Sequence, residues 1–207
     1  MTKFFKFLYV STLPAGFIFA GSGLLWLYYF RLLEGGFYER LVTYATDWNS
    51  AHILLSLSAI MIFPAALVIR QLVRDKPGRV LAEIAAVMAL FGSFFLGGQY
   101  VIDFIMPLIA RAGGEAITVH NEFFTDPWVN TMFYNLQDLA SISLLLGTIA
   151  LFWSKTIDLK YFGILIALWV AIIAGGIMDI PLLARPAFIV LGLALIPVSR
   201  KLYQEMK

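Results

Sequence analysis

Residues 80–110 read VLAEIAAVMALFGSFFLGGQYVIDFIMPLIA, and only Glu83, Gln99 and Asp103 in this run are charged or carry a side-chain amide. About 20 apolar residues in a helix cross the roughly 30 Å hydrocarbon layer of a bilayer. This run is longer than that. It therefore predicts a membrane-spanning helix that tilts, kinks near Pro107 or projects beyond the bilayer.

The composition of the whole chain agrees with this prediction. The 207 residues are 61% hydrophobic and 14% charged, whereas soluble domains have roughly 25% charged residues. Five further apolar blocks are long enough to cross a bilayer, at 8–30, 51–69, 129–153, 161–178 and 180–199. We therefore predict an all-α, polytopic membrane bundle of six transmembrane helices, with residues 1–207 as a single transmembrane domain.

The first block resembles a signal peptide, because Lys3 and Lys6 precede it and Ala20 and Ser22 offer a small-x-small pair. Its apolar stretch continues to Phe30, which is too long for a signal peptide, so we expect a retained span. The net charge of +2 is too small to indicate nucleic acid as a partner. With no cysteine in the chain, disulfides, thiolate metal ligands and thiol catalysis are excluded.

The distribution of basic residues predicts the orientation. Six spans place four of the 15 Lys and Arg residues on one side, namely Arg31, Arg40, Arg111 and Arg185. The other eleven fall on the side of the termini, so the positive-inside rule predicts cytoplasmic termini in a multi-pass protein of the cell membrane. The connections 32–50 and 112–128 then lie outside. Both carry aromatic residues suited to the membrane interface, and Asp126 in the second is placed to cap the fourth helix.

Polar residues within the spans gather toward the outer side. On the third span, Gln99, Asp103, Pro107 and Arg111 share a helical face at four-residue spacing. On the fourth, Thr131, Tyr134, Asp138 and Ser141 repeat at three- and four-residue steps, with Gln137 beside them. His52 opens the second span, and Asp179 stands in the turn at 175–179 that separates the last two spans.

A charge at the bilayer centre costs roughly 2.5–3.5 kcal/mol on insertion scales, so such groups should face the bundle interior and find partners. We therefore expect one outward-opening pocket in which ligand-binding or proton-linked roles fall to Gln99, Asp103, Tyr134, Asp138 and His52, joined by Gln137 and Asp179. Structural roles remain open: Asp103 can pair with Arg111 or bond Gln137, and Asp179 can cap the sixth helix. Because its helix supplies no cation, Asp138 is the residue expected to carry an exchangeable proton, while Asp103 stays ionised.

Three functions from different classes fit this pattern. The first is a transporter, or its substrate-capture subunit, that binds a small ligand or ion and needs a homo-oligomer or a partner membrane subunit for alternating access. The second is an intramembrane enzyme acting at the outer leaflet on a lipid or small amphiphile. It would use carboxylates alone, or a metal whose ligands would be His52, Asp103 and Asp138. The third is a non-catalytic scaffold or sensor. No motif for a P-loop, a serine hydrolase or an HExxH metalloprotease is present, and the cofactor stays unknown.

Overall fold

The structure is a computed structural model that describes residues 2–206. Over these residues the chain is 87% helical and has no strand. Six helices are long and apolar enough to span a membrane, which confirms the predicted fold class. Their bounds are Lys3–Arg31 (α1), Ala45–Leu72 (α3), Arg79–Ala112 (α4), Pro127–Trp153, Leu159–Ile177 (α8) and Pro181–Glu205.

Two of these spans are built from several pieces. The fourth consists of α6 (Pro127–Asn130), a π-helical turn η1 (Thr131–Asn135) and α7 (Asp138–Trp153). The sixth consists of α9 (Pro181–Ala194) and α10 (Ile196–Glu205). The remaining helices, α2 (Phe37–Thr43) and α5 (Gly114–Thr125), lie in the two connections that the charge pattern places outside.

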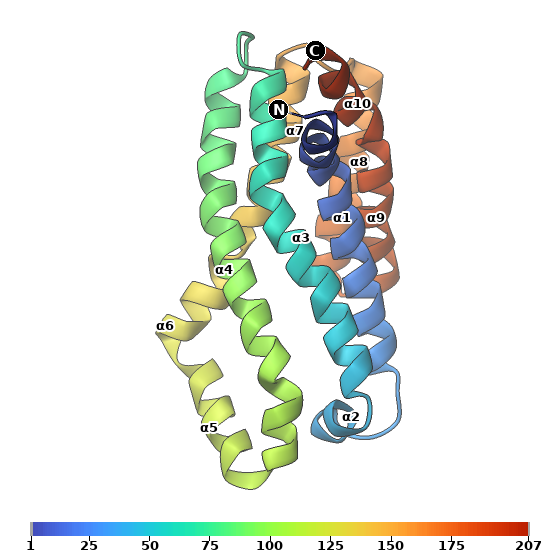
Figure 1. The fold of residues 1–207 in the computed structure, drawn as a ribbon. Coiled ribbons are helices and arrows are strands. Elements are labelled where there is room, and N and C mark those ends of the chain that lie inside the picture. The colour runs from blue at the N-terminus through green and yellow to red at the C-terminus, as the bar shows by residue number, and fades with distance from the viewer. Residues whose placement is uncertain (1, 207) are drawn as a thin grey trace.

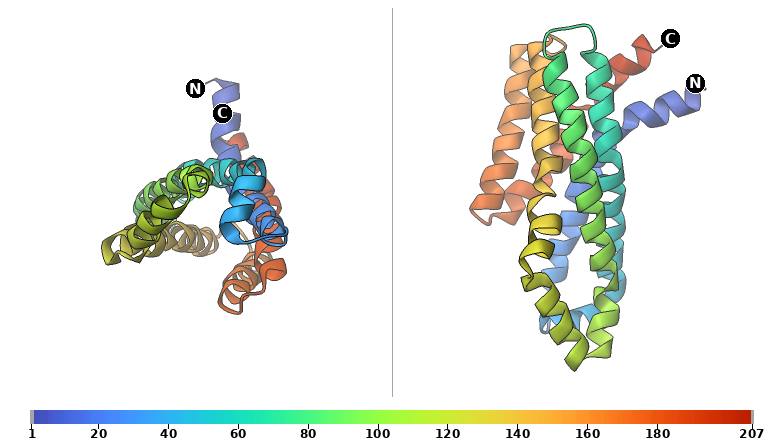
Figure 2. Two further views of the ribbon diagram at one scale, coloured as in Figure 1. Left: turned by 90° about the horizontal axis from the view of Figure 1, so that it is seen from below. Right: turned by 90° about the vertical axis from the view of Figure 1, so that its left-hand side faces the viewer.

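The spans form a curved row rather than a closed ring (Figure 2). Along this row the order of neighbours is α8, α9, α1, α3, α4 and α7, and the contact between α7 and α8 at its two ends is slight. Both termini lie at one end of the bundle, together with the α3–α4 and α7–α8 connections (Figure 1). We call the opposite end, where α2 and the α4–α5 turn lie, the distal end.

The close packing of α4 on α7 depends on a glycine. A Cβ built on Gly92 would lie 2.2 Å from the backbone nitrogen of Ala140, so only glycine allows the two backbones to approach this closely. Ala89 and Ala140 are buried in the same apolar core, which continues through α1, α3, α8 and α9. The small residues therefore position α7, the helix that carries Asp138.

The third predicted span, at 80–110, proves to be one uninterrupted helix. α4 has 34 residues and continues through Pro107, whereas α8 has 19. At about 1.5 Å per residue these lengths are about 51 Å and 28 Å. The α4–α5 hairpin extends well past the α8–α9 turn (Figure 1), so α4 reaches further toward the distal end than α8.

A turn between α8 and α9 is present, but it lies at 178–180, because α8 continues to Ile177 where the sequence predicted a turn at 175–179. The backbone N–H of Ile180 donates to the carbonyl of Gly175 at 2.7 Å. Pro181 occupies the first turn of α9, where proline is tolerated. The expected capping role of Asp179 is wrong. The residue adopts a left-handed conformation with φ of +50°, and the N-cap position of α9 belongs to Ile180.

Candidate functional site

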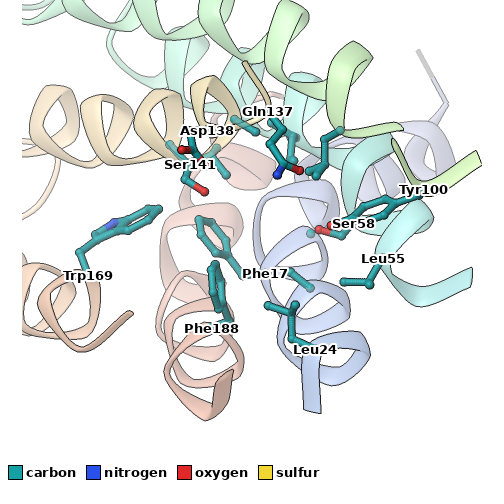
Figure 3. A pocket seen from close by; sticks show the side chains of 16 residues that line it. Phe17, Leu24, Leu55, Ser58, Tyr100, Gln137, Asp138, Ser141, Trp169 and Phe188 are labelled. Atoms are coloured by element: carbon teal, nitrogen blue, oxygen red, sulfur yellow. The ribbon is translucent and has the colours of Figure 1, made fainter. Parts of the chain in front are cut away.

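A cavity of about 210 Å³ lies inside the curve of the bundle (Figure 3). Every span contributes to its wall, and the lining residues lie in the middle and distal half of their helices. One representative from each span, in chain order, is Phe17, Ser58, Tyr100, Asp138, Trp169 and Phe188. The cavity is thus a product of the whole fold and not of one helix pair.

Asp138 is the one charged residue among those that line the cavity. Its side chain is exposed rather than packed away, and it lies beside Ser141 at the cavity wall (Figure 3). Within residues 2–206 the ion pairs are His52–Asp103, Arg70–Glu83 and Arg79–Glu83, so Asp138 has no cationic partner in the part of the chain described. A carboxylate in this position is available to something that enters the cavity.

The interruption of the fourth span explains why Asp138 faces inward. In η1 the N–H of Leu136 donates to the carbonyl of Thr131, five residues back, before α7 resumes at Asp138. An extra residue in one turn rotates the following side chains by about 100° relative to a regular α-helix. The predicted stripe of Thr131, Tyr134, Asp138 and Ser141 is therefore broken between Tyr134 and Asp138.

Irregular backbone at membrane depth is tolerated where it lines a cavity and its polar groups find partners. Gln137 supplies one such partner, because its side-chain N–H donates to the carbonyl of Tyr134 at 3.0 Å. This bond leaves the amide oxygen of Gln137 as an acceptor, and Gln137 also lines the cavity. The predicted cap on this span is confirmed, since the Asp126 carboxylate accepts from the backbone N–H groups of Trp128 and Val129.

Aromatic rings form the wall opposite Asp138 (Figure 3). The rings of Phe17 and Trp169 meet edge to face with centroids 5.8 Å apart, and Phe188 lies beside them. The indole N–H of Trp169 donates to Oγ1 of Thr148 at 3.2 Å. Because its polar group is already bonded, Trp169 presents carbon surface to the cavity.

A second polar group lies nearer the distal end, between α3 and α4. Nε2 of His52 lies 3.4 Å from Oδ2 of Asp103, and the two side chains are 2% and 15% exposed. Nδ1 of His52 lies 2.7 Å from the carbonyl oxygen of Trp48. The indole N–H of Trp48 in turn donates to the carbonyl oxygen of Asp103 at 2.7 Å, which joins the two helices a second time.

The contact at Nδ1 indicates the tautomer of His52. A carbonyl oxygen accepts hydrogen bonds and cannot donate them, so Nδ1 of His52 carries a proton. Nε2 then faces the carboxyl group of Asp103 on the neighbouring helix.

Tyr100 separates this pair from the cavity. Its ring centroid lies 6.2 Å from that of His52, and its side chain lines the cavity wall. The two polar groups are consequently neighbours, with one aromatic side chain between them. Tyr100, Ser58 and Trp169 were not identified from the sequence, because an aromatic or serine residue in an apolar helix has the same pattern as ordinary core packing.

The residues predicted to form one pocket fall into separate places. Gln137 and Asp138 line the cavity, while His52 and Asp103 form the pair beside it. The side-chain amide oxygen of Gln99 is buried and has no hydrogen-bond partner within residues 2–206. Tyr134 packs on Phe124 with ring centroids 5.3 Å apart. Asp179 is exposed in the α8–α9 turn.

Two specific interactions proposed from the sequence are corrected. The carboxylate of Asp103 contacts His52 and not Arg111, because α3 brings an imidazole closer than the arginine two turns away on the same helix. The amide of Gln137 bonds its own chain at Tyr134 and not Asp103.

The set of metal ligands suggested by the sequence is also not assembled. Across residues 2–206 no three His, Asp or Glu side chains lie close enough together to hold a metal ion. His52 and Asp103 meet, but Asp138 belongs to the cavity. Comparison of the chain with protein-family models, with curated protein sequences and with solved structures gives no match.

Proposed function

We propose that this integral membrane protein binds a small ligand in the central cavity, as a transporter or as the substrate-capture subunit of one. The observation that carries the proposal is the unpaired carboxylate of Asp138 in a cavity to which every span contributes. Small-molecule sites are typically concave and mostly apolar, with a few polar groups that orient the ligand. Asp138, Gln137 and Ser141 are such groups.

The energetics favour function over a purely structural role for Asp138. An ionisable side chain at this depth destabilises an inserted helix, and a structural carboxylate recovers that free energy by pairing with a cation or a hydrogen-bond donor. No side-chain hydrogen bond to the Asp138 carboxylate is formed by the residues described, in contrast to Asp126 and Asp158, which cap helices. A ligand that pairs with the carboxylate of Asp138 would recover part of the free energy that its insertion costs.

The location of the cavity favours transport or capture in particular. Substrate sites of membrane transporters lie near the bilayer midplane, often beside interrupted helices. Here the cavity extends from the middle of the spans toward the distal end, and the π-helical turn borders it. Because α7 and α8 contact each other only slightly, the bundle is packed least tightly on that side. A second subunit or a second copy of the chain would provide the surface against which these helices move.

The test is to fill the cavity and examine what the protein retains. Ala20 lines the cavity, so Ala20→Leu occupies part of its volume, whereas Ala112→Leu adds the same group at an exposed position. Native mass spectrometry of protein purified in mild detergent should show a small molecule bound to the wild type and to Ala112→Leu but not to Ala20→Leu. If all three proteins carry the same molecules in equal amounts, the cavity is not the binding site.

One observation supports the alternative of an intramembrane enzyme. The His52–Asp103 pair brings an imidazole and a carboxyl group together beside Tyr100, which lines the cavity, and these are the side-chain types that most often act as general acids and bases. On this alternative a lipid or small amphiphile in the cavity is the substrate. Conversion of the bound molecule, detected as a mass change in the same experiment and abolished in His52→Gln, would favour the enzyme over the transporter.

A further inference from the structure

We infer that the ligand of the central cavity is a small organic ammonium cation. This inference rests on the proposed function and names the chemical class of its ligand. The composition of the wall is the first reason: Asp138 is its one acidic residue, it has no basic residue, and its other polar members are Ser58, Tyr100, Gln137 and Ser141. A positively charged ligand can pair with the Asp138 carboxylate, whereas an anion meets no cationic side chain in this wall.

The aromatic wall is the second reason. Organic ammonium groups bind to the faces of aromatic rings as well as to carboxylates, because the ring face carries partial negative charge. Phe17, Trp169 and Phe188 supply apolar ring surface across the cavity from Asp138 (Figure 3). With its N–H bonded to Thr148, Trp169 contributes ring surface without an unsatisfied donor.

The size of the cavity separates an organic cation from a metal ion. The cavity has a volume of about 210 Å³, which is more space than a bare metal ion fills. Divalent ions such as Ca²⁺ require six to eight oxygen ligands at about 2.3–2.6 Å, and this wall offers one carboxylate. An ammonium group with alkyl substituents fills the space, with its charge near Asp138 and its carbon atoms against the three rings. The free amide oxygen of Gln137 can accept a hydrogen bond from an N–H or O–H group on the same ligand.

The test compares two water-soluble probes that differ in one atom. Choline carries a quaternary nitrogen, and 3,3-dimethylbutan-1-ol has carbon in the same place, so shape is kept while the charge is removed. Binding is measured by isothermal titration calorimetry and by the rise in Tm of the purified protein, which depends on ligand concentration and Kd. We expect choline to bind wild-type protein at least about tenfold more tightly than its neutral analogue.

Substitutions then test which residues make the charged probe bind more tightly than the neutral one. Asp138→Asn keeps the size of the side chain and should abolish the preference, leaving choline no tighter than the alcohol. Asp75→Asn is the matched control, because it removes a carboxylate from an exposed loop outside the cavity and should leave both affinities unchanged. Trp169→Leu retains Asp138 but removes a ring, and should weaken choline more than the alcohol.

The outcomes distinguish this inference from the proposed function. The comparison of the two probes on wild-type protein needs no substitution, so it remains decisive even if Asp138→Asn fails to fold. Equal binding of the two probes, lost in Ala20→Leu, would overturn the cationic ligand while the binding function stands. A preference for choline that persists in Asp138→Asn would also overturn it. Absence of binding by either probe overturns the cationic ligand, and the proposed function is then judged by the cavity-filling experiment alone.

Discussion

Nε2 of His52 and Oδ2 of Asp103 lie 3.4 Å apart between α3 and α4, so an imidazole from one helix meets a carboxyl group from the next. The imidazole is almost completely buried, and its other nitrogen is bonded to the carbonyl of Trp48. The pair is therefore a fixed part of the interface between the two helices, and its removal has consequences that can be measured.

The first prediction concerns the partner of Asp103. Asp103→Leu should lower the free energy of unfolding by about 1–3 kcal/mol, because it leaves a buried imidazole nitrogen without a partner. Asp103→Asn should cost less, since an amide N–H can donate to Nε2. Adding His52→Leu to Asp103→Leu should restore part of the loss, because two apolar groups then replace both partners. Unfolding in detergent with a denaturing co-detergent measures these differences.

The matched control for this series is Arg111, the partner expected from the sequence. Arg111→Gln combined with Asp103→Leu should give additive effects within about 0.5 kcal/mol, as for residues that do not interact. A strong coupling between positions 103 and 111, together with none between 52 and 103, would contradict the structure.

The second prediction concerns the proton positions on His52. In ¹⁵N NMR spectra of protein labelled at histidine, Nδ1 of His52 should have the shift of a protonated nitrogen, because it donates to the carbonyl of Trp48. The chain has two histidines, so the spectrum of His120→Asn assigns the remaining signals directly to His52. A pyridine-type shift at Nδ1 would show that the imidazole is reversed.

The third prediction concerns the contact between α4 and α7. Gly92→Ala should lower stability by about 1–3 kcal/mol, since the new methyl group would force two backbones apart. Gly97→Ala on the same helix meets no atom within 4 Å, so it should be neutral or stabilising by up to about 1 kcal/mol. Thermal unfolding of the two variants side by side measures the difference, and equal Tm values would show that α7 packs elsewhere.

The fourth prediction concerns orientation. A cysteine at Thr118, in exposed α5, should react with a membrane-impermeant thiol reagent added to intact cells. A cysteine at Asp75, in the exposed α3–α4 loop, should react only after the membrane is permeabilised. The chain has no native cysteine, so each signal comes from one position. The reverse pattern would place the termini outside.

The spans could be predicted from the sequence because long apolar runs have one stable arrangement in lipid, an intact helix. For the same reason the extent of 80–110 was nearly correct despite its unusual length. The α8–α9 turn was also identified, because Asp179 and Pro181 mark a short break between two apolar blocks.

The site was less predictable, and η1 shows why. Spacing of three and four residues places side chains on one face only if the helix is regular, and the π-helical turn separates Tyr134 from Asp138. No residue in 131–135 signals this turn, which contacts α4 and the short helix α6 that precedes it. The partner of Asp103 was missed for a related reason. A contact along one helix can be read from spacing, whereas His52 reaches Asp103 from another helix whose rotation depends on the whole bundle.

The unequal lengths of α4 and α8 have a consequence for the environment of the histidine–aspartate pair. If the hydrocarbon layer begins near Arg79, about 20 residues of α4 cross it, which brings its outer boundary to about Gln99. Asp103 then lies a turn beyond, among lipid headgroups, while the cavity lies within the hydrocarbon layer. Water and ions from the distal side should therefore reach this pair more readily than the ligand site, which acyl chains surround.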